Sequence, residues 1–261
     1  MNNRVIKLRD FISKIIFPLF VIIIWELSSY FLEFREQTPT PSTIIATTWD
    51  LLVNGSLLKA TFVSMERILI GFIIAALLAL PLGLIMGESK WFDRQLSPLI
   101  ESFRPIAPIA LLPLSILWFG PGTPAAIFLI AWAAFFPLVV NTIAGVREVD
   151  NNLVLSAKTM GVKSYNIFTK IIIKGALPRI IVGSRISLGI AWAAVIAAEL
   201  AVSAQAGDGS GGVGQMMFIF YAFSSDMNSI ISTMIMVGVF GYLLDLVLRK
   251  IGQKLIVWKT I

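Results

Sequence analysis

Long apolar stretches alternate with short polar ones along almost the whole chain. Residues 15–32, 68–86, 125–146, 180–204 and 230–248 are predominantly apolar. A helix needs about 20 such residues to cross a bilayer, so each stretch predicts one transmembrane helix. A sixth stretch, 106–119, is shorter and is interrupted by Pro108 and Pro113. We expect it to be partly irregular and shielded by protein rather than lipid. The pattern predicts an all-α integral membrane protein with six transmembrane helices.

The composition supports this prediction and narrows the chemistry. Hydrophobic residues make up 57% of the chain and charged residues only 14%, whereas a soluble domain is about 25% charged. The chain contains no cysteine and no histidine. Disulfides and thiolate metal sites are therefore excluded, and the commonest general base is missing. A membrane enzyme would have to work with carboxylates, serine and lysine, and no convergent carboxylate motif is present. We predict no catalytic residues, no cofactor and no metal site.

Basic residues are divided unequally between the polar connections. If both termini lie on one side of the membrane, that side receives all 21 basic residues except Arg35, Lys59 and Arg67. Positive charge is retained on the cytoplasmic side. We therefore predict a cytoplasmic N-terminal segment (1–14), a membrane domain (15–250) and a cytoplasmic tail (251–261). The net charge of +6 then reports topology and not a nucleic-acid partner.

Three connections carry more specific expectations. Residues 44–58 could form an amphipathic helix at the membrane interface, and residues 88–104 are expected to be a loop with Trp91 as an interfacial anchor. The glycine-rich segment 205–228 lies on the outer side. Part of it could re-enter the membrane. Residues 207–214 are either a flexible turn before the last helix or a docking and gating element for another protein, because dense glycine indicates only a sharply bending backbone.

The polar, lysine-rich segment 150–178 predicts two short helices around a glycine. The Asp-Asn-Asn run at 150–152 can cap the first helix, and Gly161 tolerates the left-handed backbone that ends one. Ser164 can cap the second helix, and Pro178 is expected to end it because proline has no N–H group. Such a hairpin beside a membrane suits contact with a protein partner. The alternative is an amphipathic hairpin that lies passively on lipid headgroups.

This segment resembles the EAA coupling segment of ABC-transporter permeases. In that motif Glu-Ala-Ala is followed by three residues, a glycine, a variable stretch and a Leu-Pro ending. The matching positions here are Leu155, Ser156, Ala157, Gly161, Leu177 and Pro178. Leu155 stands where the motif has glutamate, and Ser156 stands at its first alanine. The surface contact of that glutamate is therefore absent or replaced, while the helix–glycine–helix frame is kept.

Three further stretches, RPIAPIALLPLSILWFG (104–120), AAFFPLVVNTIAGVREVD (133–150) and GSRISLGIAWAAVIAAEL (183–200), are similar to the nitrate/sulfonate/taurine/bicarbonate branch of these permeases. The resemblance implies a type I importer for a small anion, located in a bacterial inner membrane. It implies two permease copies, cytoplasmic ATPases that dock on a coupling loop at 147–180, and an extracytoplasmic solute-binding protein. The chain has no phosphate-binding loop of its own, so ATP hydrolysis is expected in another subunit.

Other functions stay open at this point. The same scaffold could carry a different solute, such as a heterocyclic vitamin precursor. An ATP-independent carrier or channel is a second alternative, although it would predict symmetric repeats and deep coupling carboxylates. Neither feature is obvious in the sequence.

Polar residues inside apolar stretches are the candidates for the translocation pathway, because such residues are costly in a membrane. They are Arg67, Ser115, Trp118, Asn141 and Glu199. Each also has a structural explanation. Arg67 could pair with Glu66 or Glu199, Glu199 could form a helix-packing or gate hydrogen bond, and the others could hold helices together. Arg185, near the cytoplasmic end of its stretch, is expected to snorkel or to bond neighbouring carbonyl groups.

Overall fold

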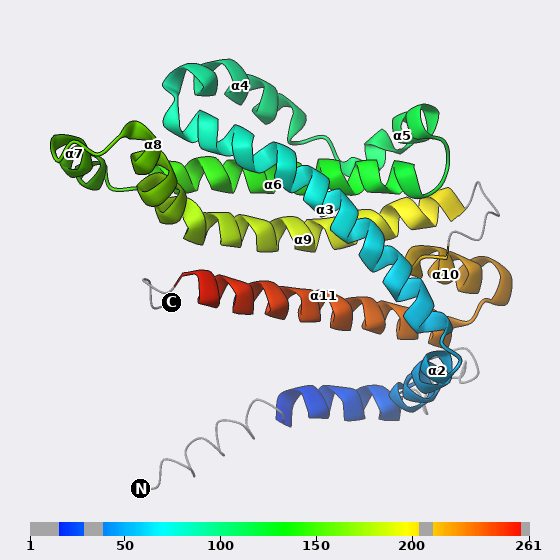
Figure 1. Cartoon of the computed structure of the whole chain (residues 1–261). Coiled ribbons are helices and arrows are strands. Elements are labelled where there is room, and N and C mark those ends of the chain that lie inside the picture. The colour runs from blue at the N-terminus through cyan, green and yellow to red at the C-terminus, as the bar shows by residue number, and fades with distance from the viewer. Residues whose placement is uncertain (1–15, 29–38, 204–210, 257–261) are drawn as a thin grey trace, which may run out of the picture.

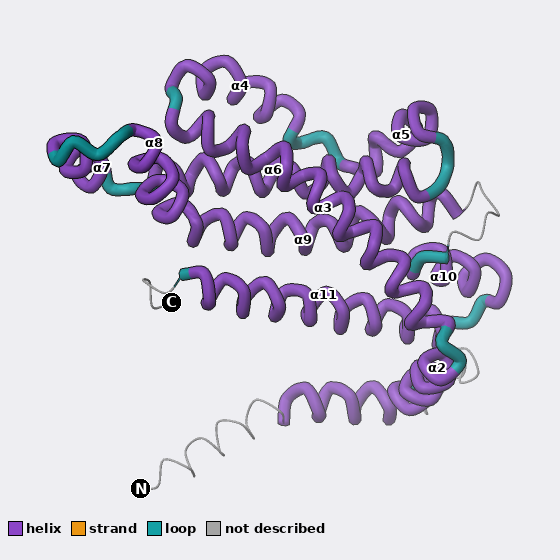
Figure 2. The backbone as a smooth tube through the Cα atoms, viewed as in Figure 1, coloured by secondary structure: helices purple, strands orange, loops and turns teal. Residues whose placement is uncertain are grey.

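A computed structural model of the protein describes residues 16–28, 39–203 and 211–256. These residues are almost entirely helical, and no strand occurs among them (Figure 2). A helix over Ile16–Ser28 is followed by α2 (Pro41–Val53), α3 (Ser56–Glu88), α4 (Lys90–Phe103), the 3₁₀ turn η1 (Pro108–Leu111), α5 (Leu112–Phe119), α6 (Thr123–Arg147), α7 (Asn151–Thr159), α8 (Ser164–Ile167), the π-helical turn η2 (Phe168–Ile172), α9 (Ile173–Ser203), α10 (Val213–Ile219), the π-helical turn η3 (Phe220–Ser224) and α11 (Met227–Leu255).

Four described helices are long and apolar enough to cross a membrane: α3, α6, α11 and the continuous helix Ser164–Ala201 that runs through α8, η2 and α9. A fifth span is the pair Lys90–Phe103 and Pro108–Phe119, which is bent by 86°. The all-α class and the broken character of the 106–119 segment are therefore confirmed. The sixth span stays a prediction, because the helix Ile16–Ser28 is short and its predicted continuation lies outside the described residues.

A stripe of small residues brings α3 against α6. Gly71, Ala75, Ala79 and Gly83 recur every four residues along α3 and are all buried. A Cβ atom on Gly83 would lie 2.6 Å from the Cβ atom of Thr142 on α6. Small side chains at this spacing let two helix backbones approach closely, which is the main source of packing energy between membrane helices. On its other side α6 packs against α9, so α6 lies at the centre of the core (Figure 1).

Two predictions for the first half of the chain were wrong. The expected loop over 88–104 is mostly helix α4 (Lys90–Phe103). Its apolar residues Leu96, Leu99, Ile100 and Phe103 recur at helical spacing and face one apolar cavity. The helix expected over 44–58 begins earlier, at Pro41, and ends at Val53. A capping box between the Thr40 and Thr43 side chains sets its start.

The missing N–H group of Pro178 predicted that the second helix of the hairpin ends at this residue. This prediction was wrong. Pro178 lies inside α9, and the helix continues unbroken to Ser203. Proline removes one hydrogen bond, and in a membrane helix neighbouring elements make this tolerable. Here Ala176 is fully buried, and its backbone lies against Gly145 of α6. Ser164 is also not the cap: Lys163 occupies that position, and no side chain caps the helix.

The helices define two ends of the molecule (Figure 1). One end carries the α7–α8 hairpin, the start of α4 and the last turns of α11, and the other end carries α5, α10 and the start of α3. Basic residues of α4, α7–α9 and α11 gather at the hairpin end. This grouping agrees with the cytoplasmic orientation inferred from charge, although residues 1–15 and 257–261 lie outside the described part of the chain.

Candidate coupling and pathway sites

The first site is the hairpin formed by α7 and α8, whose turn is closed by backbone hydrogen bonds. The Asp150 carboxylate accepts a bond from the Asn152 N–H group at 2.8 Å and caps α7. At its other end the Gly161 N–H donates to the Lys158 carbonyl (3.0 Å) and the Val162 N–H to the Ala157 carbonyl (3.1 Å). Gly161 has φ of +75°. Together these features form a Schellman motif, so both the cap at 150–152 and the role of Gly161 are confirmed.

The matched motif residues divide into an inner and an outer group. Ala157 is only 3% exposed and packs with Val146, Ile167, Ile172 and Ala176 at the base of the hairpin. Leu177 and Pro178 are partly buried in the first turns of α9, whereas Leu155 and Ser156 point outward. The outer surface of the hairpin carries large apolar side chains at Leu155, Met160 and Tyr165, the last two being 74% and 76% exposed. An apolar surface on a polar, membrane-side loop indicates a protein contact.

The second site is a buried ion pair near the opposite end of the molecule. Arg67 of α3 and Glu199 of α9 approach to 2.7 Å between Nη1 and Oε1, and their side chains are only 4% and 1% exposed. The Ser64 hydroxyl lies 2.8 Å from both carboxylate oxygens. The Gly214 N–H group of α10 donates to Oε2 at 2.9 Å. The Glu199 carboxylate therefore has ionic and hydrogen-bond partners on several sides, which a buried carboxylate requires.

This network joins four helices. Arg67 also donates to the Thr123 hydroxyl at the start of α6 (2.9 Å from Nη2), and the Ser64 oxygen accepts from the Val213 N–H group (2.9 Å). A Cβ atom on Gly214 would lie 2.7 Å from that of Glu199, so only glycine fits at this approach of α10 to α9. Of the two partners that the sequence suggested for Arg67, the structure selects Glu199.

Arg185 has a different partner from the one expected. Its guanidinium forms a two-pronged contact with Asp245 of α11, with N–O distances of 2.6 and 2.8 Å. It therefore neither snorkels nor bonds carbonyl groups. This pairing could not be predicted with any precision from the sequence, because the two residues belong to apolar stretches that are far apart in the chain.

The three remaining pathway candidates lie in different environments. Ser115 is fully buried and donates to the Leu112 carbonyl of its own helix (2.7 Å). Trp118 is 61% exposed and stacks edge-on against Phe128 with ring centroids 5.9 Å apart. Asn141 donates to the Pro137 carbonyl at 2.8 Å and lines a cavity of about 310 Å³ between η1, α6 and α9. The structure thus does not gather these side chains into one site.

The cavity beside Asn141 also includes Arg104, which the sequence analysis assigned to a cytoplasmic loop. Arg104 follows the last residue of α4, where the broken span bends. The sequence signal that could have shown this placement is that Arg104 stands directly before Pro105 and the proline-interrupted stretch. Arg104 therefore lies at the opposite end of α4 from Lys90 and Arg94, which line a cavity with residues of the hairpin.

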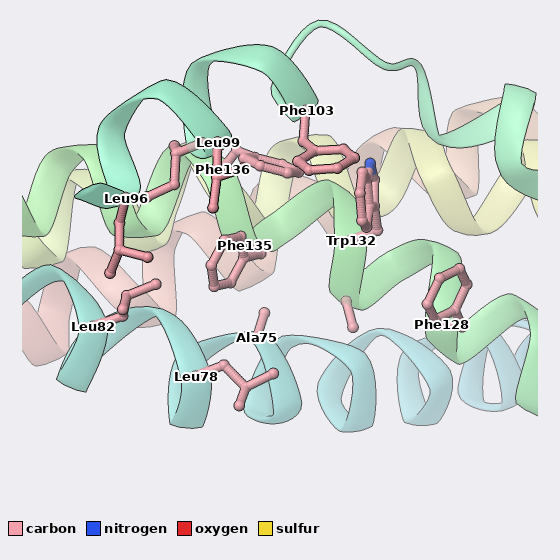
Figure 3. A pocket seen from close by; sticks show the side chains of 12 residues that line it. Ala75, Leu78, Leu82, Leu96, Leu99, Phe103, Phe128, Trp132, Phe135 and Phe136 are labelled. Carbon is pink, nitrogen blue, oxygen red and sulfur yellow. The ribbon is translucent and has the colours of Figure 1, made fainter. Parts of the chain in front are cut away.

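A second, larger cavity of about 430 Å³ lies between α3, α4 and α6 (Figure 3). Leu78, Leu82, Leu96, Phe135 and other apolar side chains line it, and no charged residue does. Trp132 lines both cavities and separates them. The larger one suits hydrocarbon and offers nothing to a charged solute.

A bundle of membrane-crossing helices with a broken span and an exposed polar hairpin is an architecture typical of membrane transport subunits. The chain belongs to the family described as "binding-protein-dependent transport system inner membrane component", whose model matches residues 79–257. It is therefore an ABC importer permease and a multi-pass membrane protein. The resemblance drawn from the sequence is confirmed.

Individual relatives place the chain in the sulfonate/nitrate group. A putative ABC transporter permease of Methanocaldococcus jannaschii is 38% identical, with 97% of this chain and 94% of the relative covered. A putative aliphatic sulfonates transport permease of Bacillus subtilis is 35% identical, with 97% and 90% covered. The nitrate import permease of Synechococcus elongatus is 28% identical, with 95% and 90% covered.

Among solved structures, one of the MetNI methionine ABC transporter in an inward-facing conformation is similar to this fold. The TM-score is 0.65 at 18% sequence identity, and the match covers 76% of this chain and 95% of the other. The likeness at this identity concerns the fold alone.

Proposed function

We propose that two copies of this chain form the translocation pathway of an ATP-driven importer for a small anion of the nitrate, bicarbonate or sulfonate class. A soluble binding protein delivers the solute outside, and cytoplasmic ATPases hydrolyse ATP. The anion class is supported by the relatives, one described as a sulfonate permease and another as a nitrate permease. The observation that carries the coupling role is the rigid hairpin with its outward apolar residues.

The hairpin provides the contact with the ATPase. Helix α7 is capped at both ends and packs on α8 through Ala157, so it can move as a rigid body. Leu155 occupies the place of the motif glutamate, and with Met160 it presents apolar surface where an ionic contact would otherwise form. An exposed amphipathic helix of this kind fits a hydrophobic groove on a partner.

Helix α9 connects this contact with the outer end of the molecule. The helix Ser164–Ala201 is continuous, so displacement of the hairpin moves Glu199 as well. Glu199 holds α3 and α10 through Arg67 and Gly214. We assign Arg67 and Glu199 to the outer gate of the pathway. Their pairing sets the position of α10, and neither residue binds the solute.

Two other functions fit less well. A heterocyclic vitamin precursor on the same scaffold would not need the positive cavity at Arg104. An ATP-independent carrier would need a titratable coupling group, and the deeply buried carboxylate of the described residues, Glu199, is already neutralised by Arg67.

A pull-down tests the coupling assignment. The tagged chain is co-expressed with the ATPase encoded beside it and purified in detergent. Met160→Asp places a charge in the docking surface and should abolish co-purification of the ATPase while leaving the melting temperature of the permease unchanged. The control variant Asn152→Asp adds the same charge at the start of α7, where an acidic residue is favourable. This variant should bind the ATPase as well as the wild-type chain does. Normal ATPase recovery with Met160→Asp would contradict the assignment.

A further inference from the structure

Within the described membrane-crossing helices Arg67 and Arg185 each have a carboxylate partner, whereas Arg104 stands without one at the break of the bent span. Arg67 bonds Glu199 at 2.7 Å and Arg185 bonds Asp245 at 2.6 Å. Within the described chain, no carboxylate lies within 4.0 Å of Arg104, and its guanidinium has no hydrogen-bond partner. A charged side chain inside a membrane protein needs a counter-charge, a carbonyl group or a water-filled cavity. Of these, the structure provides a cavity at Arg104, whose side chain is exposed.

The cavity beside Arg104 lies well inside the membrane domain. Its walls include Trp132 and Asn141 of α6. At a rise of 1.5 Å per residue, Asn141 lies about 9 Å from the hairpin end of α6, and Trp132 lies about 14 Å from the other end. The part of α6 that lines the cavity therefore lies away from both ends of this helix.

The lining of the cavity favours negative charge. Arg104 contributes a full positive charge and Asn141 an amide, and no acidic residue contributes to the wall. The remaining lining side chains are apolar, such as Pro108, Ile186 and Ile190. A positive group in a cavity with low-dielectric walls concentrates anions. Ile186 and Ile190 are 45% and 40% exposed, so the cavity has an open side along α9.

We propose that this cavity is a binding subsite for a small oxyanion in transit, with Arg104 as the charge that selects it and Asn141 as a hydrogen-bonding wall. The proposal rests on the importer function proposed above and names a residue of its pathway. A guanidinium matches a planar or tetrahedral oxyanion with two parallel N–H bonds. A volume of about 310 Å³ is at the small end of ligand cavities. A single, exposed positive charge binds an anion weakly, and weak binding lets the anion leave the site and continue along the pathway.

The test measures uptake per ATP hydrolysed in proteoliposomes that contain the permease–ATPase complex and receive loaded binding protein, with nitrate and methanesulfonate as probes. Arg104→Gln should lower uptake per ATP about tenfold, the effect of losing one hydrogen-bonded charge. Hydrolysis stimulated by the binding protein should stay near the wild-type value. Arg104→Lys keeps the charge and should retain most of the uptake. Arg94→Gln removes an exposed arginine at the hairpin end of the same helix and should change neither quantity.

A second variant guards against misfolding of the first. Asn141→Asp conserves shape and places a negative charge against the anion, so uptake per ATP should fall at least as far as in Arg104→Gln. Wild-type uptake in both variants would overturn the proposal. A parallel loss of uptake and stimulated hydrolysis would also overturn it, because Arg104 would then position helices. If the binding protein does not stimulate ATP hydrolysis by the wild-type complex, the proposed importer function is wrong, and so is the subsite that rests on it.

Discussion

At the scale of single residues, Arg67 and Arg185 are paired with carboxylates, whereas Arg104 lines a cavity. Arg67 and Glu199 lie on α3 and α9 and are almost fully buried, and the energetic consequence of such a pair is asymmetric. Formation of the pair offsets the desolvation of both groups, whereas removal of one partner leaves an uncompensated buried charge. The Ser64 hydroxyl and the Gly214 N–H group complete the coordination of the carboxylate. We therefore expect the pair to dominate local stability at the outer end.

Glu199→Gln tests this expectation. Neutralising the carboxylate leaves Arg67 buried without its counter-charge and should destabilise the protein by about 3 kcal/mol. Thermal unfolding of the purified permease in detergent measures the loss. The double variant Arg67→Gln/Glu199→Gln should recover part of it. Glu66→Gln, which removes an exposed carboxylate one position away from Arg67, is the matched control and should unfold like wild type. Equal unfolding temperatures for Glu66→Gln and Glu199→Gln would contradict the account.

At the scale of elements, local chemistry was predictable where it depends on neighbours in sequence. The Asp150 cap and the left-handed Gly161 follow from short-range backbone geometry, and both are present. The end expected at Pro178 was wrong, because packing of Ala176 against α6 outweighs the one hydrogen bond that proline removes. Helix α4 was missed because its polar residues resembled a loop, although its apolar residues have helical spacing.

The packing of α3 on α6 was also readable in principle. Gly71, Ala75, Ala79 and Gly83 follow one another at intervals of four, a pattern typical of close helix contacts in membranes. Their partner, α6, could not be derived from the pattern, because every apolar helix in the chain is a possible neighbour.

Gly83→Val tests the close contact. Even the first carbon of a side chain at this position would lie 2.6 Å from the Thr142 Cβ atom, so valine should push α3 from α6 and cost about 1–3 kcal/mol by overpacking. Gly238→Val introduces the same side chain into α11, where nothing lies within 4 Å of the new Cβ position. A fall in melting temperature is expected for the first variant only. If both variants melt alike, the contact with α6 is not what requires a small residue.

At the scale of the whole molecule, one helix links the two functional ends. The hairpin at one end and the Glu199 network at the other lie on the same continuous segment, Ser164–Ala201. The membrane class and the permease family could be inferred from the apolar stretches and the motif order, and the cytoplasmic side of the hairpin stays a prediction from the charge distribution. The Arg67–Glu199 and Arg185–Asp245 pairs and the cavity at Arg104 could not, because they depend on which apolar helices become neighbours in space.

The central claim is that this chain moves an anion only when an ATPase drives it. The most direct measurement is uptake of nitrate and methanesulfonate into proteoliposomes that contain the permease–ATPase complex, with ATP and the loaded binding protein present or omitted. We expect uptake only when both are supplied, and its loss when Met160→Asp uncouples the hairpin. Solute entry at the same rate without ATP would contradict the account and identify the protein as a carrier or channel.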